Sequence, residues 1–62
     1  MKVFIVLITI FAGDFSFTQA RQAEYINKDT CMEQAYIEAV DLYIAGSFDD
    51  VGYQCVEIGA SI

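Results

Sequence analysis

The chain has 62 residues, with nine acidic and three basic side chains, no histidine and a formal net charge of −6. Such a negative charge repels phosphate backbones and anionic lipid surfaces, so we expect neither nucleic-acid binding nor membrane lysis of the cationic type. A nucleophile would lack its usual histidine base, and two cysteines are too few for a structural zinc site. We therefore predict no enzyme, no catalytic residue, no metal and no cofactor.

Residues 1–20 have the pattern of a secretory signal peptide. Lys2 provides a basic start, residues 3–12 form an apolar centre, and Ala20 is a small residue at the end of the segment. The apolar run is well short of the about 20 residues that a transmembrane helix needs. The pattern predicts cleavage between Ala20 and Arg21.

Cleavage at that point defines the predicted domain organisation: residues 1–20 are a signal peptide and residues 21–62 are a secreted, extracellular polypeptide without stable membrane insertion. A chain of that size seldom buries enough apolar surface to fold alone, and it usually needs a disulfide, a metal or a partner. If residues 1–20 stay attached instead, their apolar run packs on the exposed helix predicted below, and the fold expected for residues 21–62 changes.

Residues 21–29 show no hydrophobic period and are predicted to form a flexible arm. The strongest local signal for a helix comes next: a Thr-x-x-Glu capping box, which marks a helix N-terminus, starts at Thr30. Neither glycine nor proline interrupts residues 31–45, and Gly46 suits the end of a helix. We predict a helix over residues 31–45, within a helical segment that spans residues 30–46.

Apolar side chains cover most of the circumference of this helix when residues are placed about 100° apart. Tyr36, Val40, Tyr43 and Ile44 share one side, and tyrosine is common at protein interfaces. These four residues are the candidate partner-binding face. The favoured interpretation is that they pack on the segment that follows the helix, namely on Phe48, Val51, Tyr53 and Val56, and a homodimer in which they meet their copies also remains open.

Cys31 and Cys55 are the only cysteines, and outside the cytosol one intramolecular disulfide is the expected pairing. Closing this loop should stabilise the fold by about 3–4 kcal/mol. The helix carries the chain about 21 Å away from Cys31, whereas the Cα atoms of bonded cysteines lie within about 7 Å of each other. Residues 47–62, the return segment and tail, must therefore come back in a bent and partly extended form.

The predicted fold class is mostly α: a small secreted peptide with one main helix and a short bent or partly helical return, stapled by one disulfide. A lone strand in residues 21–62 would have no partner for a sheet. Pairing of each cysteine with another chain remains the alternative to the intramolecular bridge.

The leading functional hypothesis is a small secreted, non-enzymatic polypeptide that binds an extracellular protein or receptor. Its size and expected secretion suggest a secretory-gland product, such as a component of seminal fluid, saliva or venom. The large apolar surface of the helix suggests a second hypothesis, a dimeric carrier of small apolar ligands. The third is a truncated or poorly folded secreted product without a fixed activity.

Overall fold

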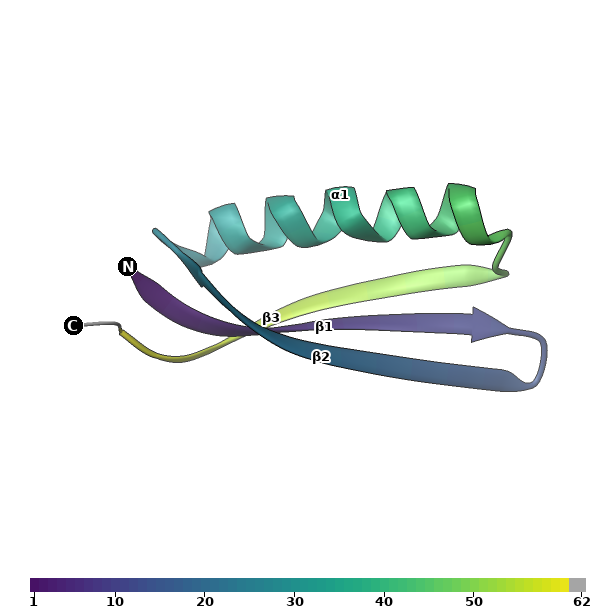
Figure 1. The fold of residues 1–62 in the computed structure, drawn as a ribbon, viewed down its shortest axis with the longest axis horizontal. Coiled ribbons are helices and arrows are strands. Elements are labelled where there is room, and N and C mark those ends of the chain that lie inside the picture. Colours follow the sequence, from purple (N-terminus) through teal and green to yellow (C-terminus); the bar gives the residue numbers. More distant parts are fainter. Residues whose placement is uncertain (61–62) are drawn as a thin grey trace.

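Three strands and one helix make up residues 1–60, the part of the chain that the computed structural model describes; for Ala60 only the backbone is described. Strands β1 (Lys2–Ala12) and β2 (Phe15–Tyr25) precede helix α1 (Lys28–Gly46), and strand β3 (Asp50–Ala60) follows it. The strands form an antiparallel sheet in the order β2-β1-β3, and α1 packs along one face of it (Figure 1).

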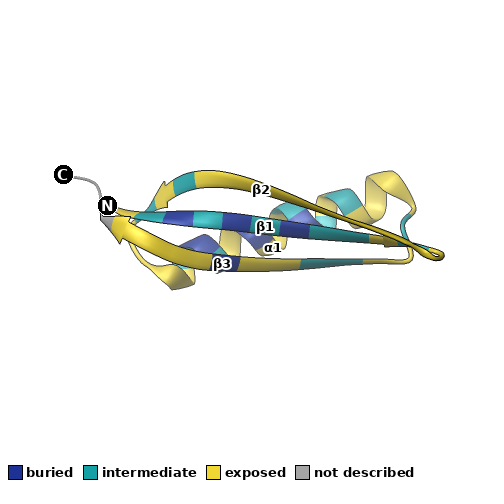
Figure 2. Ribbon diagram, turned by 90° about the horizontal axis from the view of Figure 1, so that it is seen from below, coloured by how far each residue is buried: buried dark blue, intermediate teal, exposed yellow. Residues whose placement is uncertain are grey.

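Strand β1 is the centre of the sheet and supplies much of the core. Its side chains alternate, so that Phe4, Val6 and Ile8 are buried beneath α1 while the residues between them lie partly exposed on the opposite face (Figure 2). Valine and isoleucine favour strands, and burial beneath the helix accounts for the apolar character of Phe4, Val6 and Ile8. Ile5 and Leu7 lie on the face that the helix does not cover, where an antiparallel sheet usually carries polar residues.

The turn Gly13-Asp14 joins β1 to β2. Gly13 has a φ of 61°, a left-handed conformation that glycine adopts without steric cost and that tight hairpins favour. The backbone N–H of Gly13 donates to the Asp49 carboxylate, and the N–H of Asp49 donates to the carbonyl of Phe11 at 2.9 Å. These bonds fasten the start of β3 to the hairpin.

The helix is confirmed over residues 31–45 and extends beyond them at both ends. The expected N-cap at Thr30 is wrong, because the side chain of Asn27 caps the helix by accepting the N–H of Thr30 at 2.8 Å. At the other end Ser47 adopts a left-handed φ of 54°. Gly46 lies against the ring of Phe48, where a Cβ atom would overlap that ring. A larger residue at this position would therefore displace the Phe48 ring.

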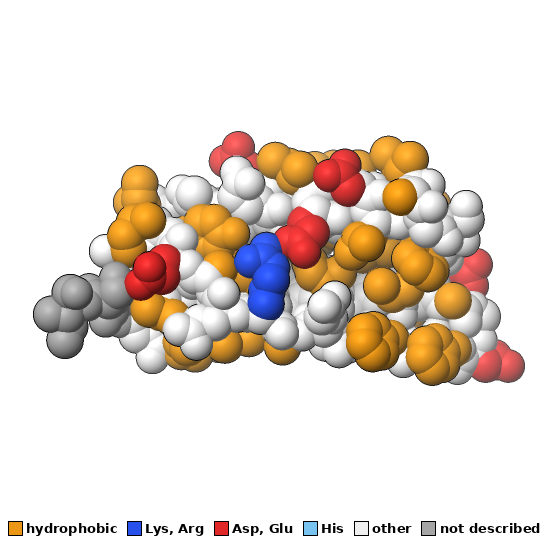
Figure 3. All heavy atoms as spheres, in the orientation of Figure 1, with side chains coloured by type: hydrophobic (Ala, Val, Ile, Leu, Met, Phe, Trp, Pro, Cys, Tyr) orange, Lys and Arg blue, Asp and Glu red, His pale blue; other side chains and the backbone are white. Residues whose placement is uncertain are grey.

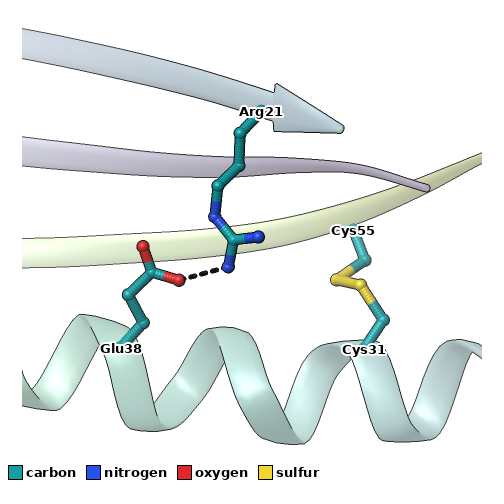
Figure 4. A network of polar contacts seen from close by, with 4 residues as sticks. All are labelled: Arg21, Cys31, Glu38 and Cys55. Atoms are coloured by element: carbon teal, nitrogen blue, oxygen red, sulfur yellow. Dashed lines mark hydrogen bonds and ion pairs between the residues drawn. A yellow bond between two sulfur atoms is a disulfide. The ribbon is translucent and has the colours of Figure 1, made fainter. Parts of the chain in front are cut away.

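The predicted disulfide between Cys31 and Cys55 is confirmed and joins the first turns of α1 to the middle of β3, with Cα atoms 6.3 Å apart (Figure 4). Both cysteines are buried in the same cluster as Phe4 and Val6. On the helix, Ala35 is buried too, and its small side chain lets α1 approach the sheet closely. The disulfide thus lies inside the core that the first strand and the helix create.

The mostly helical fold class is wrong, because the structure is mainly a sheet. Residues 1–20, which are expected to be removed, form β1 and more than half of β2, and the apolar run packs on the helix as expected for an uncleaved chain. Residues 21–29, expected as a flexible arm, belong to the end of β2 and the start of α1.

The prediction of a short bent or partly helical return is also wrong. Residues 50–60 are a strand paired with β1, which supplies the sheet partner that residues 21–62 lack by themselves. The partly extended return inferred from the distance between the cysteines is confirmed. The end of the predicted tail, residues 61–62, lies outside the described residues. Within the described part of the chain, no helix is both long and apolar enough to span a membrane.

Candidate partner-binding groove

An open groove of about 200 Å³ lies between helix α1 and strand β3. We call it the α1–β3 groove. Most of its lining is aromatic or aliphatic, with one carboxylate, and its residues are Tyr36, Ala39, Val40, Tyr43, Asp50, Val51 and Tyr53. The helix provides the first four of these residues and the strand the other three.

The helical wall of the groove follows from the spacing of its residues. Positions that are three, four and seven residues apart lie on one side of a helix, so Tyr36, Val40 and Tyr43 line up along the groove. Ala39 is buried and forms the floor. The span from Tyr36 to Tyr43 corresponds to about 10 Å of helix, which is the length available to a bound segment.

The strand wall is held against the helix by an aromatic contact. The rings of Tyr36 and Tyr53 meet edge to face, with centroids 5.6 Å apart and planes inclined by 70°. Such pairs contribute about 0.5–1.5 kcal/mol beyond the area they bury. Tyr36 and Tyr43 remain about half exposed, at 53% and 50%, and Tyr53 is 38% exposed. The rings of Tyr36 and Tyr53 therefore support each other, and all three tyrosine rings remain accessible from outside.

Asp50 places a carboxylate in the groove at the start of β3. One of its oxygens accepts the N–H of Val51 at 2.8 Å, which orients the group. The neighbouring Asp49 is engaged elsewhere, with the hairpin at Gly13. Of these two aspartates, Asp50 is therefore the one that lines the groove. No lysine or arginine is among the lining residues.

Strand β3 is an edge strand. Its hydrogen-bonded neighbour is β1, and the sheet order β2-β1-β3 leaves its outer side without a partner strand in the described part of the chain. An edge strand exposes unpaired N–H and C=O groups that can pair with an added strand. The groove thus combines a polar backbone edge with an apolar wall of side chains.

The basic side chains near the sheet are occupied by ion pairs. Arg21 donates from Nη2 to Oε2 of Glu38 at 2.5 Å, and Lys2 lies 3.6 Å from Glu57 (Figure 4 shows the first pair). The hydrogen bond to Glu38 is the main reason that the pKa of Arg21 is raised above its ordinary value, and Tyr25 adds to the effect. Among the described residues, Lys28 is the only basic side chain without an ion pair.

The structure brings together three of the four residues predicted to form a partner-binding face. Tyr36, Val40 and Tyr43 line the groove, whereas Ile44 is 72% exposed and lies outside it. Of the predicted cleavage residues, Ala20 and Arg21 both lie in β2. Neither belongs to the groove.

The strand wall of the groove corresponds to the alternative in which the helical face packs on the segment that follows the helix, and the contact between Tyr36 and Tyr53 agrees with that alternative. Val51, Tyr53 and Cys55 alternate along the chain, which would place them on one side of a strand. With the expected disulfide at Cys55, that pattern could have directed Tyr53 toward the helix. The signal is weak because the alternation is short and the apolar Val56 follows Cys55 directly.

A second group of exposed apolar side chains lies away from the groove, at the hairpin end of β2. Phe15 and Phe17 are the largest of them. Figure 3 shows hydrophobic side chains at the lower right of the molecule, where Figure 1 places the hairpin end of β2. These rings lie outside the lining of the α1–β3 groove, so they provide a matched comparison for experiments on it.

Comparison of the chain with protein-family models, with curated proteins and with solved structures found no significant match.

Proposed function

We propose that this chain is a small, non-enzymatic extracellular protein that binds an extended segment of a protein partner in the α1–β3 groove. The observation that carries the proposal is the groove itself, in which accessible tyrosines from the helix stand beside an edge strand. Tyrosine is enriched among the residues that dominate binding energy at interfaces. The buried disulfide fits a protein that folds in an oxidising compartment.

Strand addition is the binding mode that suits this geometry. An extended segment can pair with the outer edge of β3 through main-chain hydrogen bonds and place alternate side chains into a neighbouring groove. Side chains on one face of a strand repeat about every 7 Å, and the tyrosine wall is about 10 Å long. The groove therefore has room for two successive side chains of the bound segment.

The size of the groove favours side chains over a separate small molecule. Sites for drug-sized ligands usually enclose about 300–1,000 Å³, whereas this groove is open and holds about 200 Å³. The carrier of apolar ligands and the homodimer through Tyr36, Val40, Tyr43 and Ile44 are alternative outcomes of the experiments below.

Selection from a library of random displayed peptides tests the proposal. The folded, disulfide-bonded chain should enrich peptides that bind it directly, and a variant with Tyr36→Ala and Tyr43→Ala should bind them at least about tenfold more weakly. A variant with Phe15→Ala and Phe17→Ala also loses two exposed rings but should keep the affinity. Circular dichroism must show that both variants retain the fold.

Two outcomes of that selection contradict the proposal. One is the absence of enriched sequences, and the other is binding that does not change when both tyrosines are replaced. Sedimentation of the protein without peptide distinguishes the homodimer, because that alternative requires self-association that the tyrosine replacements abolish. Displacement of a fluorescent apolar probe by fatty acids, with no effect of any peptide, would favour the carrier.

The extracellular location in this proposal rests on the disulfide and not on removal of residues 1–20, and the intact mass of the native protein shows whether those residues are retained. A full-length chain has a mass of 6.9 kDa, and cleavage after Ala20 would give a clearly smaller product. The groove requires β3, whose neighbour in the sheet is β1. The proposed binding therefore belongs to a chain that keeps residues 1–20, and recovery of the cleaved form alone would contradict it.

A further inference from the structure

We infer that the partner segment places a basic side chain, lysine or arginine, against the tyrosine rings of the α1–β3 groove and beside the carboxylate of Asp50. This inference rests on the proposed function and specifies the chemistry of the residue that the groove selects. It follows from the charge, the aromatic lining and the size of the groove.

Charge is the first argument. The groove contains one carboxylate and no basic lining residue, and the whole chain carries a net charge of −6. The three basic side chains offset only three of the nine acidic ones, and Lys2 and Arg21 are each engaged with a glutamate rather than with the groove. Such a field attracts cations over long range and increases the rate at which a basic segment associates. An acidic side chain in the groove would instead meet Asp50 with its own charge partly desolvated.

The aromatic lining is the second argument. A cation within about 6 Å of a tyrosine ring is attracted by the negative face of the ring. Tyr36, Tyr43 and Tyr53 surround the groove, and all three rings are partly accessible. The edge-to-face contact between Tyr36 and Tyr53 holds two rings at a steep angle to each other. Rings that face in different directions can contact one cation from more than one side.

The shape of the groove is the third argument. Lysine and arginine place an aliphatic stem on apolar surface and keep the charged group at a polar position. Ala39, Val40 and Val51 provide the apolar surface, and Asp50 provides the polar position. A purely apolar side chain would contact the same surface and leave the Asp50 carboxylate without an ionic partner, with the N–H of Val51 as its hydrogen-bond donor.

A second copy of the chain is a poorer occupant. It brings the same net charge of −6 toward the groove, and within the described residues Lys28 is its only basic side chain without an ion pair. Repulsion between two such molecules opposes the approach. The inference therefore concerns a different protein.

Two synthetic peptides test the inference directly. Both consist of alternating threonine and valine, one with a central arginine and the other with citrulline, which has nearly the same shape but no charge. Titration into the isotopically labelled full chain, followed by NMR, should shift the amide signals of residues 36–43 and 50–53. At about 0.02 M salt the arginine peptide should bind about tenfold more tightly, and the difference should shrink at about 0.5 M salt.

A matched pair of variants assigns the preference to Asp50. Asp50→Asn should remove most of the preference for arginine over citrulline, whereas Asp41→Asn, which changes the net charge equally outside the groove, should retain it. Equal affinity of the two peptides for the groove would overturn the inference about charge and leave the proposed function intact. Signal shifts confined to other residues, or no binding by the arginine peptide, would also overturn the inference. Only the displayed-peptide selection with the tyrosine variants decides the proposed function.

Discussion

Replacement of Phe4 by alanine should remove a large part of the stability of the full chain. Phe4 has an exposed fraction of 0%, lies in the cluster around the disulfide and has the ring of Tyr25 6.3 Å away, centroid to centroid. Truncating a buried phenylalanine to alanine costs about 3–5 kcal/mol. A domain of this length has a total unfolding free energy of about 3–9 kcal/mol. The variant should therefore lose about half or more of its unfolding free energy in the middle of that range, and a protein at the lower end of the range would be unfolded.

Urea denaturation of the disulfide-bonded chain, followed by circular dichroism, measures the effect. Because Phe4→Ala can abolish folding, Ile8→Val provides a milder second variant in the same strand. It should cost about 1 kcal/mol and lower the urea midpoint by about 1 M for a protein of this size. Phe15→Ala is the control, since that ring is 65% exposed, and it should cost less than about 1 kcal/mol.

The comparison refutes the reasoning if Phe4→Ala and Ile8→Val are no more destabilising than Phe15→Ala. That result would mean that β1 does not pack against the helix in solution, and that residues 1–20 are dispensable for the folded part of the chain. The predicted order of the three variants follows from burial alone and does not depend on any function of the protein.

Three further predictions concern the disulfide, an ion pair and the end of the helix. Replacing Cys31 and Cys55 together by alanine should lower the unfolding free energy by about 3–4 kcal/mol, measured by urea denaturation, and an unchanged midpoint would contradict a structural role. Replacing Arg21 by alanine should cost less than about 1 kcal/mol because the pair with Glu38 is partly exposed. Since the pKa of Arg21 is raised, the contribution of its charge should persist through neutral pH and fall only above the ordinary arginine pKa; a double-mutant cycle with Glu38→Gln measures it. Ser47→Gly should raise the melting temperature and stabilise by about 1 kcal/mol, because Ser47 has a φ of 54° that glycine adopts without strain.

The helix and the disulfide could be predicted from the sequence because their signals are local or pairwise. An uninterrupted run of helix formers ending at Gly46 predicts α1 without knowledge of its surroundings. Two cysteines allow only one intramolecular pairing, and the length of the helix then requires an extended return. That distance argument correctly anticipated the extended conformation of β3. It could not identify the partner of β3, because the partner lies in the segment expected to be removed.

The sheet could not be predicted with the same reasoning because its central strand resembles a leader segment. A basic residue followed by a short apolar run is typical both of a signal peptide and of a buried central strand. Only the surroundings distinguish the two, namely β2 and β3 on either side and the helix above. The sequence contained one local clue, since Gly13-Asp14 lies between two stretches of equal length and suits a hairpin turn.

The groove depends on strand β1, because β1 is the sheet neighbour of β3, which forms one wall of the groove. Tyr53 reaches Tyr36 from a strand whose neighbour in the sheet is β1. Loss of residues 1–20 would remove all of β1, including the buried side chains of Phe4 and Val6, and would leave β3 attached to the helix by the disulfide and by side-chain contacts such as that between Tyr36 and Tyr53. A strand without a sheet neighbour is not stable in water, so these contacts would not suffice to hold the tyrosine wall and the edge of β3 side by side. Cleavage after Ala20 would therefore abolish the proposed binding, and retention of the first strand is the structural condition for it.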